Sequence, residues 1–267
     1  MGTATSMGPA SAGPTVRRVD IGLFSDDPGS PAFYTDEVGL AYIEALVHSP
    51  TYQERFWDVG GSTLKINHST EPMPPGHSGY RGLVLARSGI TEPRVQVDPH
   101  GIEVCTAPPG HLGVARLGII CAVEDVAAQR RFLAEGFGGE EHAGGVRLGD
   151  TDLLLRGAER DSPGPATPVW SRGFNYLAMI VDDAMGVHRS LLDAGATPGV
   201  RPMRLGDRCL FIWVRDPHGN WIELVQYGPG EGPFREGGAP GVELPDVDLL
   251  SDHWPEITRW REQGTPI

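Results

Sequence analysis

A carboxylate with apolar neighbours is the first residue in this sequence with an evident capacity for chemistry. Residues 221–227 read Trp-Ile-Glu-Leu-Val-Gln-Tyr, and strand alternation places Glu223 on one side with Trp221, Val225 and Tyr227. Both faces of this predicted strand are largely apolar, so a carboxylate there costs free energy unless it opens into a pocket or has a partner. Burial raises the pKa of such a group and suits it to moving a proton beside a carbonyl. Glu223 is therefore our candidate general base.

Glu223 follows a tight turn that carries a family resemblance. In Asp-Pro-His-Gly-Asn, residues 216–220, Pro217 presets φ and Gly219 tolerates a positive φ. With the apolar strand predicted at 209–214, the pattern Asp-Pro-x-Gly-Asn-x-x-Glu-Leu resembles the last hairpin of the vicinal oxygen chelate superfamily. This superfamily includes glyoxalase I, bleomycin-resistance proteins and type I extradiol dioxygenases. The resemblance implies a repeated βαβββ module, with two modules forming a cup around a ligand.

The rest of the chain divides into four such modules, and we predict an α+β fold with two cup-shaped mixed sheets and helices outside. The second module contains a second Asp-Pro-His-Gly turn at 98–101, which indicates an internal repeat. Only residues 88–93 lie where its helix should be, so this module is predicted to be degenerate. The predicted modules span residues 16–68, 80–106, 114–155 and 174–226. Their helices are predicted at 31–38, at 125–135 with Gly136 as the stop, and at 183–194.

Composition shifts suggest where the domains begin and end. Residues 1–15 are Gly, Ala, Ser, Thr and Pro without periodicity, typical of a disordered leader. We predict an N-terminal glyoxalase-like domain at 16–108 and a C-terminal one at 114–229. Residues 230–267 would form a Pro/Gly linker and a final helix, with Ser251 as N-cap. Trp254, Ile257 and Trp260 on that helix are interpreted as a packing stripe.

The resemblance also implies where ligand-binding residues lie. In metal-binding relatives each cup takes metal ligands from the first and last strands of its modules. The matching positions of the third and fourth modules are Gly118, Leu154, Tyr176 and Glu223. Only Glu223 matches a metal ligand, and a tight catalytic divalent site usually needs three or four convergent ligands. We therefore expect no metal and no other cofactor, with a divalent metal as the less favoured alternative.

In the N-terminal cup the matching positions include Asp20 and Lys65, and Lys65 is the only lysine in the chain. The two side chains could face each other. One interpretation is a buried ion pair that holds a vestigial cup together. The other is a site for an anion or an amine.

Composition restricts the partners of the protein. The chain has 267 residues and a formal net charge of −13, which argues against nucleic acid and anionic membranes. Cys105, Cys121 and Cys209 are widely spaced and predict no disulfide framework, and no signal peptide or membrane span is evident. We expect a cytoplasmic monomer or homodimer that binds a small molecule.

Three functional hypotheses follow. The first is a metal-independent enzyme for isomerisation, epimerisation, cyclisation or elimination, with Glu223 as base and Tyr176 holding or protonating an oxygen. The second is a sequestering protein of the bleomycin-resistance type, in which Trp213, Trp221, Phe211 and Tyr176 stack on a planar compound. The third is a metal-dependent lyase or ring-cleaving dioxygenase with unexpected ligands.

Overall fold

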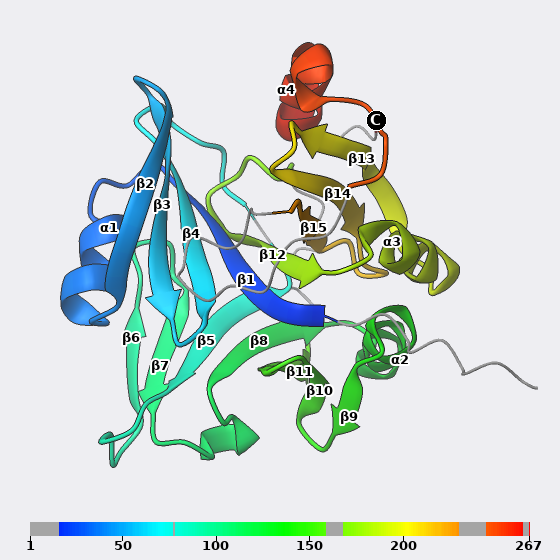
Figure 1. The fold of residues 1–267 in the computed structure, drawn as a ribbon. Coiled ribbons are helices and arrows are strands. Elements are labelled where there is room, and N and C mark those ends of the chain that lie inside the picture. The colour runs from blue at the N-terminus through cyan, green and yellow to red at the C-terminus, as the bar shows by residue number, and fades with distance from the viewer. Residues whose placement is uncertain (1–15, 77, 159–167, 230–243, 264–266) are drawn as a thin grey trace, which may run out of the picture.

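The computed structural model describes residues 16–76, 78–158, 168–229, 244–263 and 267. The expected leader, residues 1–15, and residues 230–243 of the expected linker lie outside this described part. Fifteen strands and four α-helices are described, and they form an α+β fold of two mixed sheets (Figure 1). None of the described helices is long and apolar enough to cross a membrane.

The larger sheet has eight strands in the order β13-β14-β15-β12-β1-β4-β3-β2. The first module supplies β1 (Val16–Ser25), β2 (Ala41–Ser49), β3 (Tyr52–Val59) and β4 (Ser62–Ser69). The fourth module supplies β12 (Gly173–Val181), β13 (Thr197–Leu205), β14 (Cys209–Arg215) and β15 (Trp221–Tyr227). At its centre β1 and β12 run antiparallel, and each is flanked by the parallel last strand of its own module.

The smaller sheet has seven strands in the order β6-β7-β5-β8-β11-β10-β9. The second module supplies β5 (Tyr80–Ala86), β6 (Arg94–Val97) and β7 (Glu103–Ala107). The third supplies β8 (Leu117–Val123), β9 (Glu140–His142), β10 (Gly145–Leu148) and β11 (Thr151–Gly157). No helix lies between β5 and β6 in this described stretch, which confirms the degenerate second module.

The pairing of modules differs from the sequence prediction. We expected consecutive modules to share a cup, but β1 of the first module pairs with β12 of the fourth, and β5 of the second pairs with β8 of the third. The first and last modules therefore form one cup, and the two middle modules form the other. Strand alternation predicts which residues share a face of a strand, but it does not predict which strand, some 150 residues away, lies beside it. The pairing of the first module with the fourth could therefore not be predicted from local sequence patterns.

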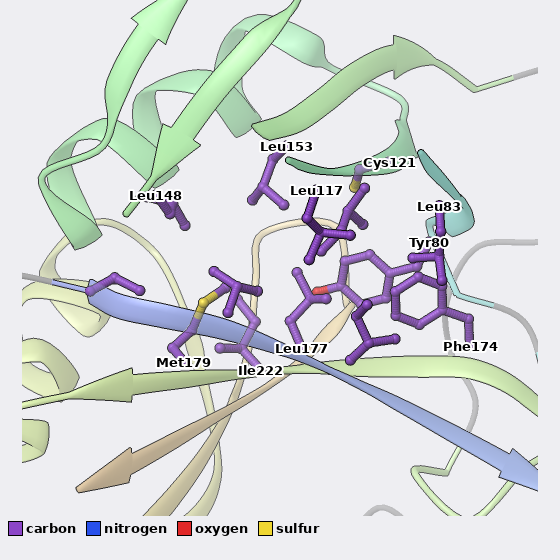
Figure 2. Close-up of a cluster of buried hydrophobic side chains, with 14 of the residues drawn as sticks. Tyr80, Leu83, Leu117, Cys121, Leu148, Leu153, Phe174, Leu177, Met179 and Ile222 are labelled. Carbon is purple, nitrogen blue, oxygen red and sulfur yellow. The ribbon is translucent and has the colours of Figure 1, made fainter. Parts of the chain in front are cut away.

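The main core lies between the two sheets. Figure 2 shows Leu177 and Met179 of β12 and Ile222 of β15 facing Leu117 of β8 and Leu153 of β11. The alternate residues of the same strands point to the opposite faces of the sheets, as Tyr176, Ala178 and Ile180 do from β12. Each sheet thus has one face in the shared core and one facing its own cup.

The helices complete this core and tie the modules together. They are α1 (Ser30–Ala32), which runs into a π-helical turn at Phe33–Glu37, then α2 (Val126–Phe137) and α3 (Ala184–Asp193). Gly136 does not end α2 as expected; the chain stays helical through Phe137, and Gly138 takes the left-handed conformation at φ 67°. Asp125 and Asp183 cap α2 and α3 by accepting hydrogen bonds from Ala128 N and Gly186 N.

The repeated Asp-Pro-His-Gly turns dock onto these helical segments. The carboxylate of Asp98 accepts a hydrogen bond from the Tyr34 hydroxyl at 3.0 Å, and that of Asp216 accepts one from Gln129 Nε2 at 2.8 Å. The turn of the second module therefore bonds to the helical segment of the first module, and the turn of the fourth module bonds to the helix of the third. This contact is the structural role of the repeat.

The final helix, α4 (Trp254–Gln263), lies against the eight-stranded sheet beside β13 (Figure 1). Ser251 is not its N-cap, because residues Leu250–His253 form a 3-10 turn that precedes it. Ile257 and Trp260 are buried against the cup face of the sheet, whereas Trp254 is half exposed. All three also line the cavity of that cup, so the stripe that was expected only to pack faces a cavity as well.

Candidate functional site

A cavity of about 340 Å³ lies in the cup of the eight-stranded sheet. Strands of the first and fourth modules form its floor and walls, and α4 contributes Trp254, Ile257, Trp260 and Arg261. Its size is within the range of small-molecule sites. The cavity is therefore our candidate active site.

Strand register places four functional candidates at the centre of this floor. Gly22 of β1 lies beside Lys65 on one side and Tyr176 on the other. One step along, Ala178 of β12 lies between Glu223 and Asp20. The four candidates had been assigned in pairs to two separate cups. The structure brings them into one.

Gly22 makes room for the Tyr176 ring. A Cβ atom at residue 22 would overlap that ring, although the strand backbone itself would accept a side chain. The Tyr176 ring is fully buried, and its centroid lies 4.7 Å from that of Trp213. The position of Tyr176 therefore depends on a glycine on the neighbouring strand.

Lys65 is the electrostatic centre of the site. Its Nζ lies 3.8 Å from Glu223 Oε2, 3.9 Å from Glu54 Oε1 and 5.1 Å from the centroid of the Tyr176 ring. Glu54 is also 3.5 Å from His48 Nε2. One ammonium thus faces two carboxylates and an aromatic ring in largely buried surroundings.

A chain of hydrogen bonds fixes the groups around this ammonium. The Tyr52 hydroxyl donates to Asn67 Oδ1 at 2.8 Å and lies 3.3 Å from Glu54 Oε1. Asn67 Nδ2 in turn donates to the Tyr176 hydroxyl at 3.2 Å and to the Leu23 carbonyl at 2.9 Å. Asn67 is buried, and its hydrogen bond fixes the position of the Tyr176 hydroxyl.

The two glutamates beside Lys65 differ in their pKa values. Burial would raise the pKa of Glu54, but Lys65 and His48 together lower it to about 2. Burial raises the pKa of Glu223 above its usual range despite Lys65, and the nearby Glu54 and Asp20 add to that rise. Burial alone would lower the pKa of Lys65, yet Tyr176 and the two glutamates hold it well above its usual range. Lys65 is therefore a permanent cation beside one ionised carboxylate and one that takes up a proton more readily.

Asp20 does not pair with Lys65 as expected. Its carboxylate lies 2.6 Å from the Arg18 guanidinium and accepts a hydrogen bond from Thr63 N at 2.7 Å. The partners of Lys65 are Glu54 and Glu223. The ion-pair interpretation is therefore wrong, and the cavity is instead lined by two charge clusters, one of Arg18 with Asp20 and one of Lys65 with its two glutamates.

Aromatic side chains form the remaining wall. Trp213 and Phe211 of β14 line the cavity, and Trp260 of α4 lies 5.2 Å from Trp213 between ring centroids. Trp221 does not line it; its ring packs behind Trp213 and Trp260 and lies under the Arg215 guanidinium. These rings provide a flat apolar surface next to the charged floor.

Gly118 and Leu154 lie outside this site, because β8 and β11 belong to the seven-stranded sheet. Conversely, sequence reasoning missed Tyr52, Glu54 and Asn67. The sequence pattern of the first module predicts a strand over residues 55–59, whereas β3 begins at Tyr52. The alternation of Tyr52, Glu54 and Phe56 was the available signal that these side chains share the face of the sheet on which Lys65 lies.

The residues at the cup centre do not fit a divalent metal. Asp20 is engaged by Arg18, and Lys65 is a cation without a lone pair to donate. In the described ranges no three His, Cys, Asp or Glu side chains converge as a metal site would require. Glu54 and Glu223 both face the Lys65 ammonium, which leaves too few free ligands.

The fold and the site together define a cup-forming βαβββ protein with a small-molecule cavity. A family model, the Glyoxalase/Bleomycin resistance protein/Dioxygenase superfamily, matches residues 23–224. The chain therefore belongs to this superfamily, as its last hairpin predicted.

Solved structures show the same fold. Glyoxalase I from Zea mays has a TM-score of 0.58 at 14% identity, covering 79% of this chain and 92% of that one. A point mutant of the same enzyme gives 0.60 at 13%, covering 79% and 93%. A putative dioxygenase from Bacillus subtilis subsp. subtilis str. 168 gives 0.50 at 16%, covering 97% and 98%. At these identities the likeness is one of fold alone. No curated protein matches the sequence.

Proposed function

We propose that this protein is a metal-independent enzyme that moves a proton next to a carbonyl group, through isomerisation, cyclisation or elimination. The observation that carries the proposal is the Glu223–Lys65 pair on the floor of an aromatic cavity, 3.8 Å apart and largely buried. It combines a base of raised pKa with a fixed positive charge. General bases work best when their pKa approaches the operating pH.

Each group has a distinct task in this proposal. Glu223 removes a proton from the carbon next to the carbonyl, and the C–H electron pair forms the carbon–carbon double bond of an enolate. The carbonyl oxygen takes the displaced pair, and Lys65 and Tyr176 stabilise its charge. Protonated Glu223 then returns the proton to another carbon, or the enolate expels a leaving group. No oxidant or reductant is required.

Lys65 acts through its charge and not as a nucleophile. Schiff-base chemistry needs a neutral amine, and such lysines have lowered pKa values. The pKa of Lys65 is held above its usual range by its anionic and aromatic neighbours. In this proposal, its ammonium provides the positive charge that a divalent ion supplies in metal-dependent enzymes.

Hydrogen–deuterium exchange tests the proposal directly. Enolisable aromatic ketones and keto acids are incubated with the protein in D2O, and loss of the signal of the hydrogens next to the carbonyl is followed by NMR. We expect exchange above the buffer rate for at least one compound, unchanged after dialysis against a chelator. Activity that disappears with chelation and returns with one divalent ion would contradict the metal-independent mechanism.

Sequestration is the second candidate, favoured by the wall formed by Trp213, Phe211 and Trp260. A sequestering protein needs affinity and no proton transfer. Compounds that bind tightly, yet exchange no hydrogen and are recovered unchanged, would favour this function over the enzyme.

A further inference from the structure

The cavity has more positive than negative side chains, although the whole chain has a formal net charge of −13. The cations in its lining are Arg18, Lys65, Arg208 and Arg261. The carboxylates are Asp20, Glu54 and Glu223. Positive side chains in the cavity of an acidic protein attract an anionic ligand.

Arg261 is the cation that α4 contributes to this lining, and its guanidinium contacts two aromatic rings. The Arg261 guanidinium lies over the Trp170 ring, 4.3 Å from its centroid, and 5.1 Å from the centroid of the Tyr52 ring. Among the residues that the structure describes, no carboxylate or other side-chain acceptor bonds to it. Stacking on aromatic faces leaves its N–H groups, which lie in the guanidinium plane, available to an acceptor.

A second arginine near the same helix shows the alternative arrangement. Arg201 lies 3.1 Å from Asp248 Oδ2 and 3.6 Å from Glu256 Oε2, so its charge is already neutralised. Arg201 does not line the cavity, whereas Arg261 does. The arginine that faces the cavity is thus the one without an ion pair among the described residues, and its charge also helps to lower the pKa of Glu54.

Arg261 and Lys65 are connected by intervening contacts. Arg261 stacks near Tyr52, the Tyr52 hydroxyl lies 3.3 Å from Glu54, and Glu54 lies 3.9 Å from Lys65. Two positive groups therefore line the same cavity, Arg261 from α4 and Lys65 from the floor. A ligand with two oxygen functions could contact both.

We propose that Arg261 binds a carboxylate of the ligand, which makes the ligand class a planar or aromatic carboxylate. Its carboxylate would pair with the in-plane N–H groups of Arg261, and its ring would lie against Trp213 and Trp260. Resting on the proposed function, the carbonyl of such a ligand would face Lys65 and Glu223 on the floor of the cavity.

Phenylpyruvate and phenylacetone are the probes for this proposal. They share a benzyl ketone, but a methyl group replaces the carboxylate in phenylacetone. Isothermal titration calorimetry is performed with wild type, Arg261→Gln, Arg261→Lys and Arg259→Gln. Arg259 is the matched control, because it lies on the same helix but is exposed.

We expect wild type to bind phenylpyruvate at least about tenfold more tightly than phenylacetone. Arg261→Gln should weaken phenylpyruvate binding by roughly ten- to hundredfold and leave phenylacetone within about twofold. Arg259→Gln should change neither, and Arg261→Lys should retain part of the preference. Equal affinity of wild type for the two probes, or equal weakening of both by Arg261→Gln, would overturn the proposal.

The same variants separate this inference from the proposed function. If Arg261→Gln loses the preference while Glu223→Gln still catalyses exchange at the wild-type rate, the anion site stands and the proton-transfer mechanism fails. If the preference survives Arg261→Gln while Glu223→Gln stops the exchange, the mechanism stands and the anion site fails. Thermal unfolding of Arg261→Gln and Arg261→Lys shows whether α4 remains folded in both.

Discussion

The two cups of this molecule have the same strand register and different interiors. In the eight-stranded cup the central positions hold Asp20, Lys65, Tyr176 and Glu223. By register, the corresponding positions of the seven-stranded cup hold Gly118, Leu154, Gly82 and Cys105. Every polar group of the first set is thus replaced by an apolar residue, a glycine or a thiol in the second.

The second cup is filled by its own side chains. Val84, Cys105, Val114, Ile120 and Leu154 are buried against one another on its concave face. A Cβ atom at Gly118 would lie 2.6 Å from Val114 Cγ2, so the segment that connects the second and third modules occupies the space there. One pair of modules surrounds a charged cavity, whereas buried apolar side chains pack together at the cup-facing positions of the other. Function in this fold therefore depends on a few positions and not on the module itself.

Substitution at the last-strand position should have the largest effect, and in one cup only. Glu223→Gln keeps the size of the side chain but removes the base, so we expect at least about a hundredfold loss in exchange rate with little change in affinity. Cys105→Ala, at the matching position of the other cup, should leave the rate unchanged. NMR exchange rates and calorimetric Kd values measure both. Equal rates for Glu223→Gln and wild type would show that Glu223 is not the base.

Lys65→Met tests the charge at the centre of the first cup. Loss of the ammonium should reduce turnover by roughly a hundredfold, because the developing oxyanion loses its main stabilising charge. Lys65 also lowers the pKa of Glu223, so its removal raises that pKa further. Since the base must be ionised, the acid limb of the kcat/KM profile should move to higher pH.

The wild-type profile provides the reference. With the pKa of Glu223 raised by burial, the acid limb should already lie above the ordinary glutamate pKa of about 4.3. A limb at that ordinary value in wild type, or one that moves to lower pH in Lys65→Met, would contradict the assignment.

Part of this site could be predicted from the sequence, and the limits are physical. Alternation on residues 221–227 correctly put Glu223 on the face of Trp221 and away from Ile222, which lies in the shared core. The turn signals located the hairpin that carries Glu223. These are properties of a few consecutive residues, and they survive folding.

Long-range pairing and packing were not predictable in this way. The meeting of Lys65 with Glu223 requires β1 and β12 to lie side by side, and no local pattern specifies that neighbour. Glu54 was missed because strand ends are poorly defined by propensity. Arg261 acquires its place only when α4 packs against the cup.

Gly22→Ala should have an intermediate effect by moving Tyr176 without altering any polar group. A methyl group at residue 22 overlaps the Tyr176 ring, and overpacking of this kind costs about 1–3 kcal/mol. We expect weaker binding and turnover, each by roughly tenfold, together with a lower Tm. An unchanged exchange rate would show that Tyr176 is not needed in its present position.

Tyr176→Phe should have the smallest effect of the series, because it keeps the ring and removes only the hydroxyl. The ring contacts with Lys65 and Trp213 stay, and the loss is limited to the hydrogen bond from Asn67 and any bond to the ligand oxygen. One such bond contributes about 1 kcal/mol, so turnover should fall severalfold. Burial raises the pKa of Tyr176, which keeps the hydroxyl protonated and able to donate.

The comparison with Glu223→Gln decides which role Tyr176 has. A severalfold loss in Tyr176→Phe, with the acid limb of the pH profile unchanged, is the result expected of a group that only orients and stabilises the oxygen. A loss as large as that of Glu223→Gln would mean that the Tyr176 hydroxyl itself transfers the proton to the oxygen. In that case the cup would act through an acid from the fourth module's first strand and a base from its last, with Lys65 of the first module between them.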